Sequence, residues 1–317
     1  MLATRRLGQS DLWITAVGIG TAPMGSTPDW RIYWGVQDER ESLRAIEVAL
    51  DLGVNWIDTA PFYGWGRAEA LVGRALRGKR AQVAIFTKCG TVRNERGEER
   101  EDLTPASIRR EVEESLRRLR TEYIDLYQFH DPDPSTPLET SWETMDALIQ
   151  EGKVRYAGLS NHPPDLMQRA LAVAPIAASQ HQYSLLAREI ERAILPFARR
   201  SGIGVLAWSP LASGFLTDRF APEMLDPQDF RRQHPFAREE AWSKLRQIRQ
   251  GLLKLARVHG HTLTDLAIAW LLHQPGLTGA IMGIRTEQDA RTMAHGLDWT
   301  LSEQERQEIE RLLAAWN

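Results

Sequence analysis

The chain has 317 residues, with 39 lysines and arginines, 42 aspartates and glutamates, and a formal net charge of −3 at pH 7. This near balance argues against nucleic acid or an anionic membrane surface as a partner. No apolar run is long enough to span a bilayer. The length predicts one large α/β domain that covers residues 1–317.

The single cysteine, Cys89, excludes an internal disulfide bond. The first residues lack the apolar stretch of a secretory signal. We therefore expect a cytoplasmic protein, because reduced thiols are typical of that compartment. Cys89 follows Lys88, and a neighbouring cation can activate a thiol. The alternative is that Cys89 is a small buried apolar side chain.

Short apolar runs alternate with amphipathic stretches, which predicts parallel strands connected by helices. Residues 5–7 and 13–15 predict a hairpin that closes one end of a barrel. Eight further runs predict strands at Val17–Gly20, 55–58, 83–87, 124–130, 154–159, 177–180, Gly204–Trp208 and 279–282. Eight strands close a barrel, so the expected fold is a (β/α)8 TIM barrel with an N-terminal β-hairpin and a C-terminal helix.

Helix starts and long loops complete the pattern. A helix is expected near Arg67, and another begins at Pro105 with Thr104 as its cap. Residues 301–316 predict a helix on the barrel wall with a capping box. The charged residues 93–102 predict a solvated loop, with a mobile lid as the alternative. Residues 211–240 form a longer connection, and such loops are often functional.

Four polar side chains occupy the places where this fold puts its chemistry. Asp58, Lys88 and His130 each fall at the end of a predicted strand, and Tyr63 follows in a loop. A tyrosine of ordinary pKa near 10 is a poor proton donor, and a nearby ammonium lowers that pKa. We therefore predict Tyr63 as a general acid and base tuned by Lys88. Asp58 would brace Lys88, and His130 would orient a substrate oxygen. A structural Asp58–Lys88 ion pair with a core histidine remains the alternative.

Several motifs occur in a fixed order along nearly the whole chain. They are Gly18-Ile19-Gly20-Thr21, the run from Asp58 to Tyr63, Thr87-Lys88, Tyr123-Ile124-Asp125-Leu126 with His130, Gly158-Leu159-Ser160-Asn161, Gln180 with Tyr183, Trp208-Ser209-Pro210-Leu211, and Ile281-Met282-Gly283-Ile284-Arg285. In these motifs the chain resembles the aldo-keto reductase family. It is most similar to the bacterial branch near the potassium-channel β subunits, which includes sugar and general aldehyde reductases.

The resemblance implies a nicotinamide dinucleotide at the barrel mouth. Ser160, Asn161 and Gln180 would hold its carboxamide, Trp208 would stack on its ring, and the long loop would clasp it. No Gly-x-Gly-x-x-Gly opens a βα unit, so a Rossmann site is not indicated. The loops after the last two strands can hold phosphate instead. The predicted cofactor residues are Gly20, Thr21, Ser160, Asn161, Gln180, Trp208, Ser209, Pro210, Leu211, Ser213, Gly214, Arg219, Gly283, Arg285 and Asp289.

The choice between the two cofactors depends on a few residues. Arg285 can grip a 2′-phosphate, and Arg231 and Arg232 could add to that site. Asp289 stands where the family usually has glutamine or arginine, and Met293 stands where it has asparagine. An aspartate repels phosphate but can accept a hydrogen bond from a free ribose hydroxyl. The arginine contacts favour NADP(H), with NAD(H) as the alternative.

The substrate side is aromatic, as small-molecule pockets often are. Trp30, Trp34, Phe62 and Trp65 are the predicted substrate residues, and a self-packed rim is the alternative. No arginine or lysine is expected in this cluster, so we do not expect an anionic substrate. The substrate class is a small carbonyl compound or alcohol.

Three functions are compatible with this pattern. The first is an NADP(H)-dependent oxidoreductase that interconverts an aldehyde or ketone, including a sugar, and its alcohol. The second is a nucleotide-binding regulatory subunit with little turnover, because fold alone does not settle activity. The third, a metal-dependent hydrolase, fits poorly, since His130, His162 and His181 near the strand ends have no accompanying set of carboxylates. No metal ion is predicted, and the oligomeric state is left open.

Overall fold

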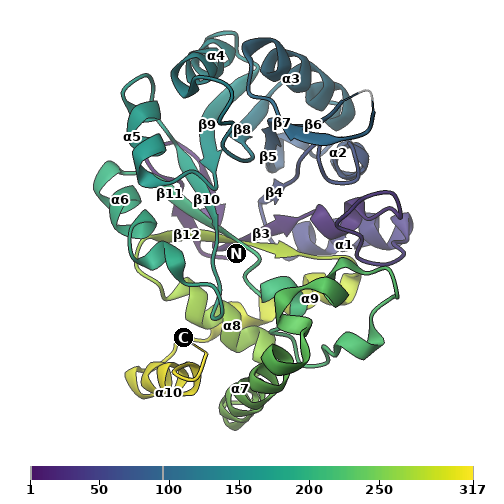
Figure 1. The fold of residues 1–317 in the computed structure, drawn as a ribbon, viewed down its shortest axis with the longest axis vertical. Coiled ribbons are helices and arrows are strands. Elements are labelled where there is room, and N and C mark those ends of the chain that lie inside the picture. The colour runs from purple at the N-terminus through teal and green to yellow at the C-terminus, as the bar shows by residue number, and fades with distance from the viewer. Residues whose placement is uncertain (1, 95, 317) are drawn as a thin grey trace.

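Eight parallel strands close into a barrel in the order β10-β11-β12-β3-β4-β5-β8-β9, so the predicted (β/α)8 fold is confirmed (Figure 1). The computed structural model describes residues 2–94 and 96–316. The barrel strands are β3 (Val17–Gly20), β4 (Trp56–Asp58), β5 (Ala84–Cys89), β8 (Ile124–Phe129), β9 (Val154–Ser160), β10 (Ala178–Gln182), β11 (Gly204–Trp208) and β12 (Leu277–Gly283). Each coincides with a predicted strand, with ends shifted by a residue or two.

Helices surround the barrel (Figure 1). They are α1 (Glu39–Asp51), α2 (Arg67–Ala75), α3 (Pro105–Leu119), α4 (Leu138–Gln150), α5 (Pro164–Leu171), α6 (Ile194–Ser201), α7 (Glu239–Val258), α8 (Leu263–Leu272), α9 (Glu287–His295) and α10 (Glu303–Leu313). The predicted Thr104 cap is present, because its hydroxyl accepts a hydrogen bond from the Ser107 amide at 3.3 Å. Within the described ranges, none of these helices is long and apolar enough to cross a membrane.

The predicted hairpin consists of β1 (Thr4–Arg6) and β2 (Trp13–Thr15), paired antiparallel. It closes the end of the barrel where the strands begin. Leu7 and Ile14 are fully buried in one cluster with Trp56. Gly8 has a φ of +55°, and a Cβ there would lie 2.4 Å from the carbonyl oxygen of Ala177, so only glycine fits this approach.

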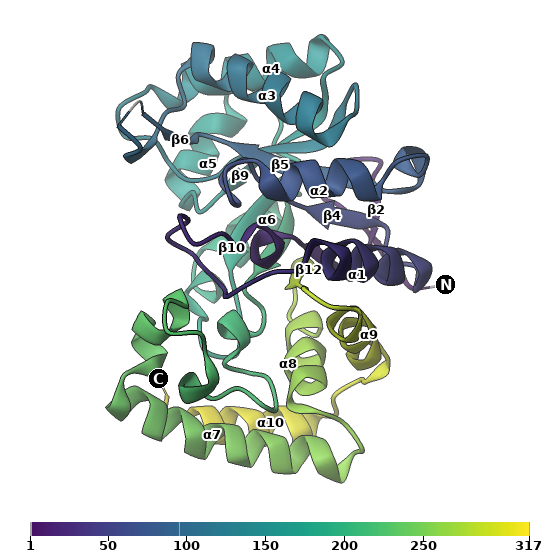
Figure 2. The ribbon, with the colours of Figure 1, turned by 90° about the vertical axis from the view of Figure 1, so that its right-hand side faces the viewer.

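The last helix, α10, starts with the predicted capping box of Ser302 and Glu305. It lies beside α7 at the outside of the molecule, and Leu312 reaches the backbone of Gly251 (Figure 2). Residues 301–316 were expected to pack on the barrel wall, but α10 contacts α7 instead. The helix packs on another helix of the outer layer.

Both long loops have more structure than a solvated coil. The described residues of the predicted solvated loop at 93–102 are exposed or half-buried, but β6 (Thr91–Arg93) and β7 (Glu99–Glu101) pair there as an antiparallel ribbon that the sequence did not predict. Its turn is fixed by the Asn94 side chain, whose oxygen accepts hydrogen bonds from the Arg96 and Glu98 amides. Residues 211–240 contain four short 3₁₀ helices, at Ala212–Gly214, Pro222–Met224, Phe230–Gln233 and Pro235–Ala237.

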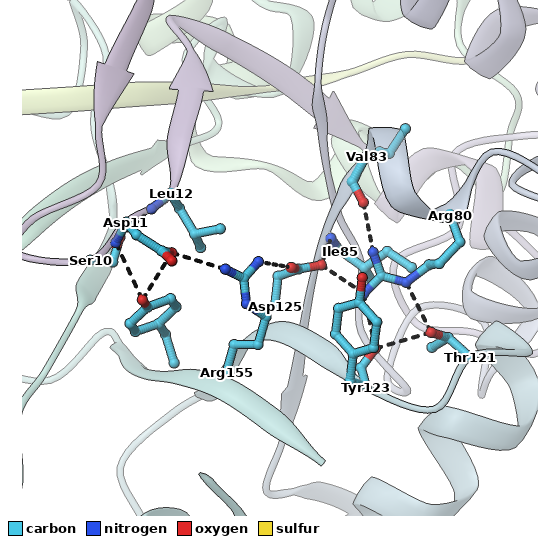
Figure 3. Close-up of polar contacts among 11 residues, drawn as sticks. Ser10, Asp11, Leu12, Arg80, Val83, Ile85, Thr121, Tyr123, Asp125 and Arg155 are labelled. Carbon is cyan, nitrogen blue, oxygen red and sulfur yellow. Dashed lines mark hydrogen bonds and ion pairs between the residues drawn. The ribbon is translucent and has the colours of Figure 1, made fainter. Parts of the chain in front are cut away.

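A buried carboxylate near the start of β8 joins several elements at the closed end (Figure 3). Asp125 is only 3% exposed, and it accepts hydrogen bonds from Arg80 at 2.7 Å and Arg155 at 2.8 Å. The Ile85 amide also donates to it, at 2.9 Å. Arg155 continues to Asp11 in the hairpin turn at 2.9 Å. The network therefore connects β5, β8 and β9 to the N-terminal hairpin.

We expect Asp125→Ala to lower the free energy of unfolding by about 3 kcal/mol, because two guanidinium groups lose their shared buried partner. Urea denaturation of the purified variant would measure this. Asp11→Ala is the matched control, since Asp11 pairs with Arg155 through a side chain that is 69% exposed. Its effect should stay below about 1 kcal/mol. Equal effects of the two substitutions would contradict the structural role of Asp125.

Candidate active site

The carboxyl ends of three neighbouring strands deliver polar side chains to one rim. Asp58 is the last residue of β4, Lys88 lies one residue before the end of β5, and His130 follows β8 directly. These strands are adjacent in the barrel. Tyr63 comes from the loop between β4 and α2. The structure therefore brings together all four residues that the sequence predicts to be catalytic.

Lys88 is at the centre of this group and is fully buried. Its ammonium donates hydrogen bonds to Asp58 Oδ1 at 2.5 Å, to the Thr59 carbonyl at 3.1 Å and to the Tyr63 hydroxyl at 3.1 Å. These three partners satisfy its three donors. The His130 ring lies edge-on to the Tyr63 ring, with 5.8 Å between their centres. The phenol and the imidazole therefore share one wall of the mouth.

Two buried glutamine side chains donate hydrogen bonds to the second carboxylate oxygen of Asp58, Oδ2. Gln180 donates to it at 2.9 Å, and Gln128 donates at 3.4 Å. Gln180, one of the predicted cofactor residues, thus braces the carboxylate. Sequence reasoning missed Gln128, although strand alternation contains the signal. Gln128 precedes His130 by two residues on β8 and therefore points to the same side.

Burial sets the protonation states at the rim. Burial raises the pKa of Tyr63, the Lys88 ammonium lowers it and Asp58 raises it again, so the net pKa lies above the ordinary value. The predicted influence of Lys88 is present, but the loss of water around a phenolate outweighs it. For Lys88, burial would lower the pKa, yet Asp58 and Tyr63 raise it overall. Burial, with help from Lys88 and Arg31, holds the pKa of His130 well below its usual value. At neutral pH the site thus has a protonated phenol, an ammonium and a neutral imidazole.

Asn161 joins the catalytic rim to the predicted nicotinamide residues. Its backbone is left-handed, with a φ of +60°. Its amide donates to Asp131 at 2.8 Å and to the His130 carbonyl at 3.2 Å, and its oxygen accepts from Trp208 Nε1 at 3.0 Å. The hydroxyl of Ser160 is buried and has no hydrogen-bond partner in the described ranges. Such an orphaned group fits a polar ligand, and an amide such as a carboxamide could pair with it.

The other predicted cofactor residues near the first strand support the rim. Gly20 and Gly283 pair across β3 and β12. Thr21 is fully buried, and its hydroxyl donates to the Asp58 carbonyl at 3.1 Å. This contact joins the end of β3 to the end of β4, so Thr21 helps to position Asp58.

The turn after β11 is tightly bonded within itself. Pro210 is buried and Leu211 packs on the main core. The Ser213 amide donates to Ser209 Oγ at 3.0 Å, and the Gly214 amide donates to the Leu211 carbonyl at 2.9 Å. The amides that were predicted to bind an anion therefore already have partners. Arg219 is exposed and forms no ion pair with any residue that the structure describes.

At the start of α9, Arg285 and Asp289 also form hydrogen bonds within the protein. The guanidinium of Arg285 donates to the Gln37 side chain at 2.6 Å and to the carbonyls of Trp34 and Val36 at 2.8 and 2.6 Å. Asp289 accepts hydrogen bonds from the Arg285 amide at 2.8 Å and the Thr286 amide at 3.0 Å. The carboxylate thus takes the Thr286 amide, one of the donors at the helix start, and places a negative charge beside the others.

The two other arginines predicted near this site are engaged as well. Arg231 pairs with Asp229 at 2.6 Å. The Arg232 guanidinium donates to the Leu225 carbonyl at 2.9 Å. Their hydrogen-bonding capacity is therefore directed to the long loop itself.

The predicted substrate residues form one aromatic cluster. Phe62 lies between Trp30 and Trp65, with 5.4 Å between ring centres on each side, and Trp34 packs against the same cluster. The expectation that no arginine belongs here is wrong. Arg31 lies over Phe62 at 5.0 Å, and Arg93 of the β6–β7 ribbon lies over Trp65 at 3.9 Å. Arg31 also pairs with Glu99 of the ribbon, which offsets its charge.

Cys89 follows Lys88 on β5, so its side chain points to the opposite face of the strand, away from the four rim residues. It is 1% exposed, and burial raises the pKa of its thiol well above the ordinary value. A buried, protonated thiol reacts poorly. The burial and the raised pKa of Cys89 therefore favour a role as a small apolar side chain over a redox role.

A barrel that presents a buried lysine–aspartate pair to a phenol and an imidazole has the groups of an enzyme that moves protons. A profile of the Aldo/keto reductase family matches residues 16–314. The chain therefore belongs to the aldo-keto reductase family, whose enzymes are oxidoreductases that use nicotinamide cofactors.

Relatives and solved structures agree with this assignment. The Bacillus subtilis aldo-keto reductase YhdN is 36% identical over 94% of this chain and 89% of that protein. An NADH-specific methylglyoxal reductase of Escherichia coli is 33% identical over 94% of each chain. The structure of the glycerol dehydrogenase AKR11B4 from Gluconobacter oxydans has a TM-score of 0.88 and 36% identity, covering 98% of this chain and 95% of that one.

We expect His130 to remain neutral until the pH falls well below 6.5, because burial and two nearby cations disfavour the imidazolium. Ring ¹⁵N shifts followed during a pH titration would measure this, with the signal assigned by its loss in His130→Asn. Arg31→Gln removes one cation through a side chain that is 63% exposed and should move the pKa of His130 upward. A His130 that titrates at or above its ordinary value would contradict the electrostatics of the site.

Proposed function

We propose that this protein interconverts an aldehyde or ketone and the corresponding alcohol, with Tyr63 exchanging the proton. One observation carries the proposal. The Tyr63 hydroxyl lies 3.1 Å from an ammonium that is itself paired with Asp58 at 2.5 Å. This arrangement suits a phenol that must lose and regain a proton.

Each side chain has a distinct task in the proposed reaction. A bound nicotinamide dinucleotide would supply or take up the hydride. In reduction, Tyr63 gives its proton to the developing alkoxide, and the charge of Lys88 stabilises the phenolate that remains. Asp58 keeps Lys88 protonated and fixed. His130, neutral at working pH, donates a hydrogen bond to the substrate oxygen.

A small, oxygen-rich carbonyl compound suits the mouth best. The Trp30, Phe62 and Trp65 rings offer apolar faces, while Arg31 and Arg93 add donors at the edge of the same cluster. Such a lining can hold a short chain or a sugar by its C–H surface and its hydroxyl groups. The names of a methylglyoxal reductase and a glycerol dehydrogenase among the similar proteins support substrates of this size.

For the cofactor, we propose that Ser160 and Asn161 meet the carboxamide and that Trp208, fixed by Asn161, meets the ring. The orphaned Ser160 hydroxyl supports this role. Gln180 would act indirectly, through its hydrogen bond to the Asp58 carboxylate. Gly20, Thr21, Pro210 and Leu211 would shape the site rather than donate to the ligand.

The contacts at α9 favour NAD(H), the alternative that the sequence left open beside NADP(H). Three of the five N–H groups of Arg285 already donate to protein acceptors, so at most two remain for a 2′-phosphate. The Asp289 carboxylate already sits at the helix start and would repel that phosphate. A carboxylate there can accept a hydrogen bond from a free ribose hydroxyl. We therefore propose a preference for NAD(H), and the name of an NADH-specific relative supports it.

We expect Tyr63→Phe to lower kcat for aldehyde reduction by about 10²- to 10⁴-fold, because the proton donor is lost. The dissociation constant of the reduced cofactor, measured by fluorescence titration, should remain nearly unchanged. Tyr156→Phe is the matched control, since the Tyr156 hydroxyl bonds to the exposed Asp11 far from the rim. A wild-type protein that binds cofactor but turns over no aldehyde, ketone or aldose would instead support the regulatory alternative.

We expect the wild-type enzyme to have a higher kcat/KM for NADH than for NADPH. Asp289→Asn should shift that ratio toward NADPH by about tenfold, or ~1.4 kcal/mol, because it removes a like charge while an amide oxygen can still accept at the helix start. Glu287→Gln is the control, because Glu287 is paired with Arg44 and Arg291 on the exposed side of the same turn. A tenfold wild-type preference for NADPH would contradict the proposal.

A further inference from the structure

Three potential metal ligands converge outside the barrel, on elements that the proposed reaction does not use. His261 lies between α7 and α8, Asp265 lies in the first turn of α8, and His295 is the last residue of α9. Figure 2 shows α8 and α9 side by side. One ligand atom from each residue lies within 4.8 Å of the other two. Sequence reasoning considered only histidines near strand ends. It missed the pair His259 and His261, of which only His261 belongs to this cluster.

The spacing of these atoms is close to that around a tetrahedral ion. Without an ion, Asp265 Oδ2 shares a hydrogen bond of 3.0 Å with His295 Nδ1, and it lies 3.7 Å from His261 Nδ1. Bonds of 2.0 to 2.1 Å in a tetrahedron place ligand atoms about 3.3 Å apart. Both distances lie within about 0.4 Å of that value. Small side-chain rotations would therefore complete the coordination.

Two polar atoms of the cluster lack partners. Asp265 is fully buried, and its Oδ1 has no hydrogen-bond partner among residues 2–94 and 96–316. The buried Nδ1 of His261 has none there either. Buried polar atoms are normally satisfied by hydrogen bonds, so both atoms need an explanation. A cation bound between Asp265 Oδ2 and the two imidazoles would give the His261 Nδ1 atom the partner that it lacks.

The cluster is also held in place by its surroundings. The His261 ring stacks on Trp299, with 4.3 Å between centres and an angle of 7° between planes. Asp265 is anchored by its capping box, in which its Oδ2 accepts from the Thr262 amide at 2.8 Å. The His295 side chain is 61% exposed, which provides an entry route and leaves room for a water ligand. Such outer contacts orient ligands before the metal binds.

We propose that His261, Asp265 and His295 bind one divalent transition-metal ion, with Zn²⁺ as the best match. Two imidazole nitrogens and one carboxylate oxygen suit zinc, whereas calcium and magnesium prefer shells of oxygen. With three protein ligands, water fills the fourth position. The ion would join the start of α8 to the end of α9. It shares no residue with the proposed catalytic group, so its role is structural.

Calorimetric titration of chelator-treated full-length protein with Zn²⁺ tests this proposal. We expect one ion per chain and a higher thermal unfolding midpoint with Zn²⁺ than with EDTA. His295→Ala, at an exposed side chain, should weaken binding by at least about 100-fold. Asp265→Asn should also weaken it strongly, and its amide oxygen can still accept at the helix start.

His259→Ala is the matched control. His259 is the neighbouring histidine, but it pairs with Glu305 at 3.2 Å and lies outside the ligand set. Its affinity for Zn²⁺ should remain within about threefold of wild type, because it removes no ligand. Absence of binding by the wild type, or equal losses in His259→Ala and His295→Ala, would overturn the proposal. Turnover should be the same with and without chelator, which separates this test from that of the proposed function.

Discussion

The buried pair of Lys88 and Asp58 is the interaction on which the mouth of the barrel depends. Removing two charges from water is costly, and their mutual attraction repays this only when every remaining donor and acceptor is satisfied. The structure meets that condition with the Thr59 carbonyl and the Tyr63 hydroxyl on one side and two glutamine amides on the other. Side chains from β4, β5, β8 and β10 therefore share one network. The phenol is part of it, so its position follows from the ion pair.

A single segment, residues 27–38, connects the aromatic cluster at the mouth to the start of α9. Trp30 packs on Phe62 at one end of the segment. At the other end, the carbonyls of Trp34 and Val36 hold the Arg285 guanidinium. Movement of the aromatic cluster would therefore be felt at the start of α9.

The sequence predicted the strands and the four rim residues well, because both depend on local pattern. Asp58, Lys88 and His130 are recognisable as polar residues at the ends of apolar runs, and the barrel fold places such ends together. Contacts between distant segments were not predictable in this way. Arg93 reaches Trp65 only because residues 91–101 fold back as a ribbon. The net pKa of Tyr63 likewise depends on how much water the finished fold excludes, which no spacing reveals.

The start of α9 shows how one local signal can carry two meanings. Thr286 and Asp289 have the spacing of a capping box, and the structure contains it. A capping carboxylate and a bound phosphate both accept hydrogen bonds from backbone amides at the start of a helix. Here the chain supplies its own carboxylate at the helix start, and that charge would repel a phosphate bound beside it. In the proposed cofactor site, the residue at position 289 would therefore affect both helix stability and the preference for a cofactor with or without the 2′-phosphate.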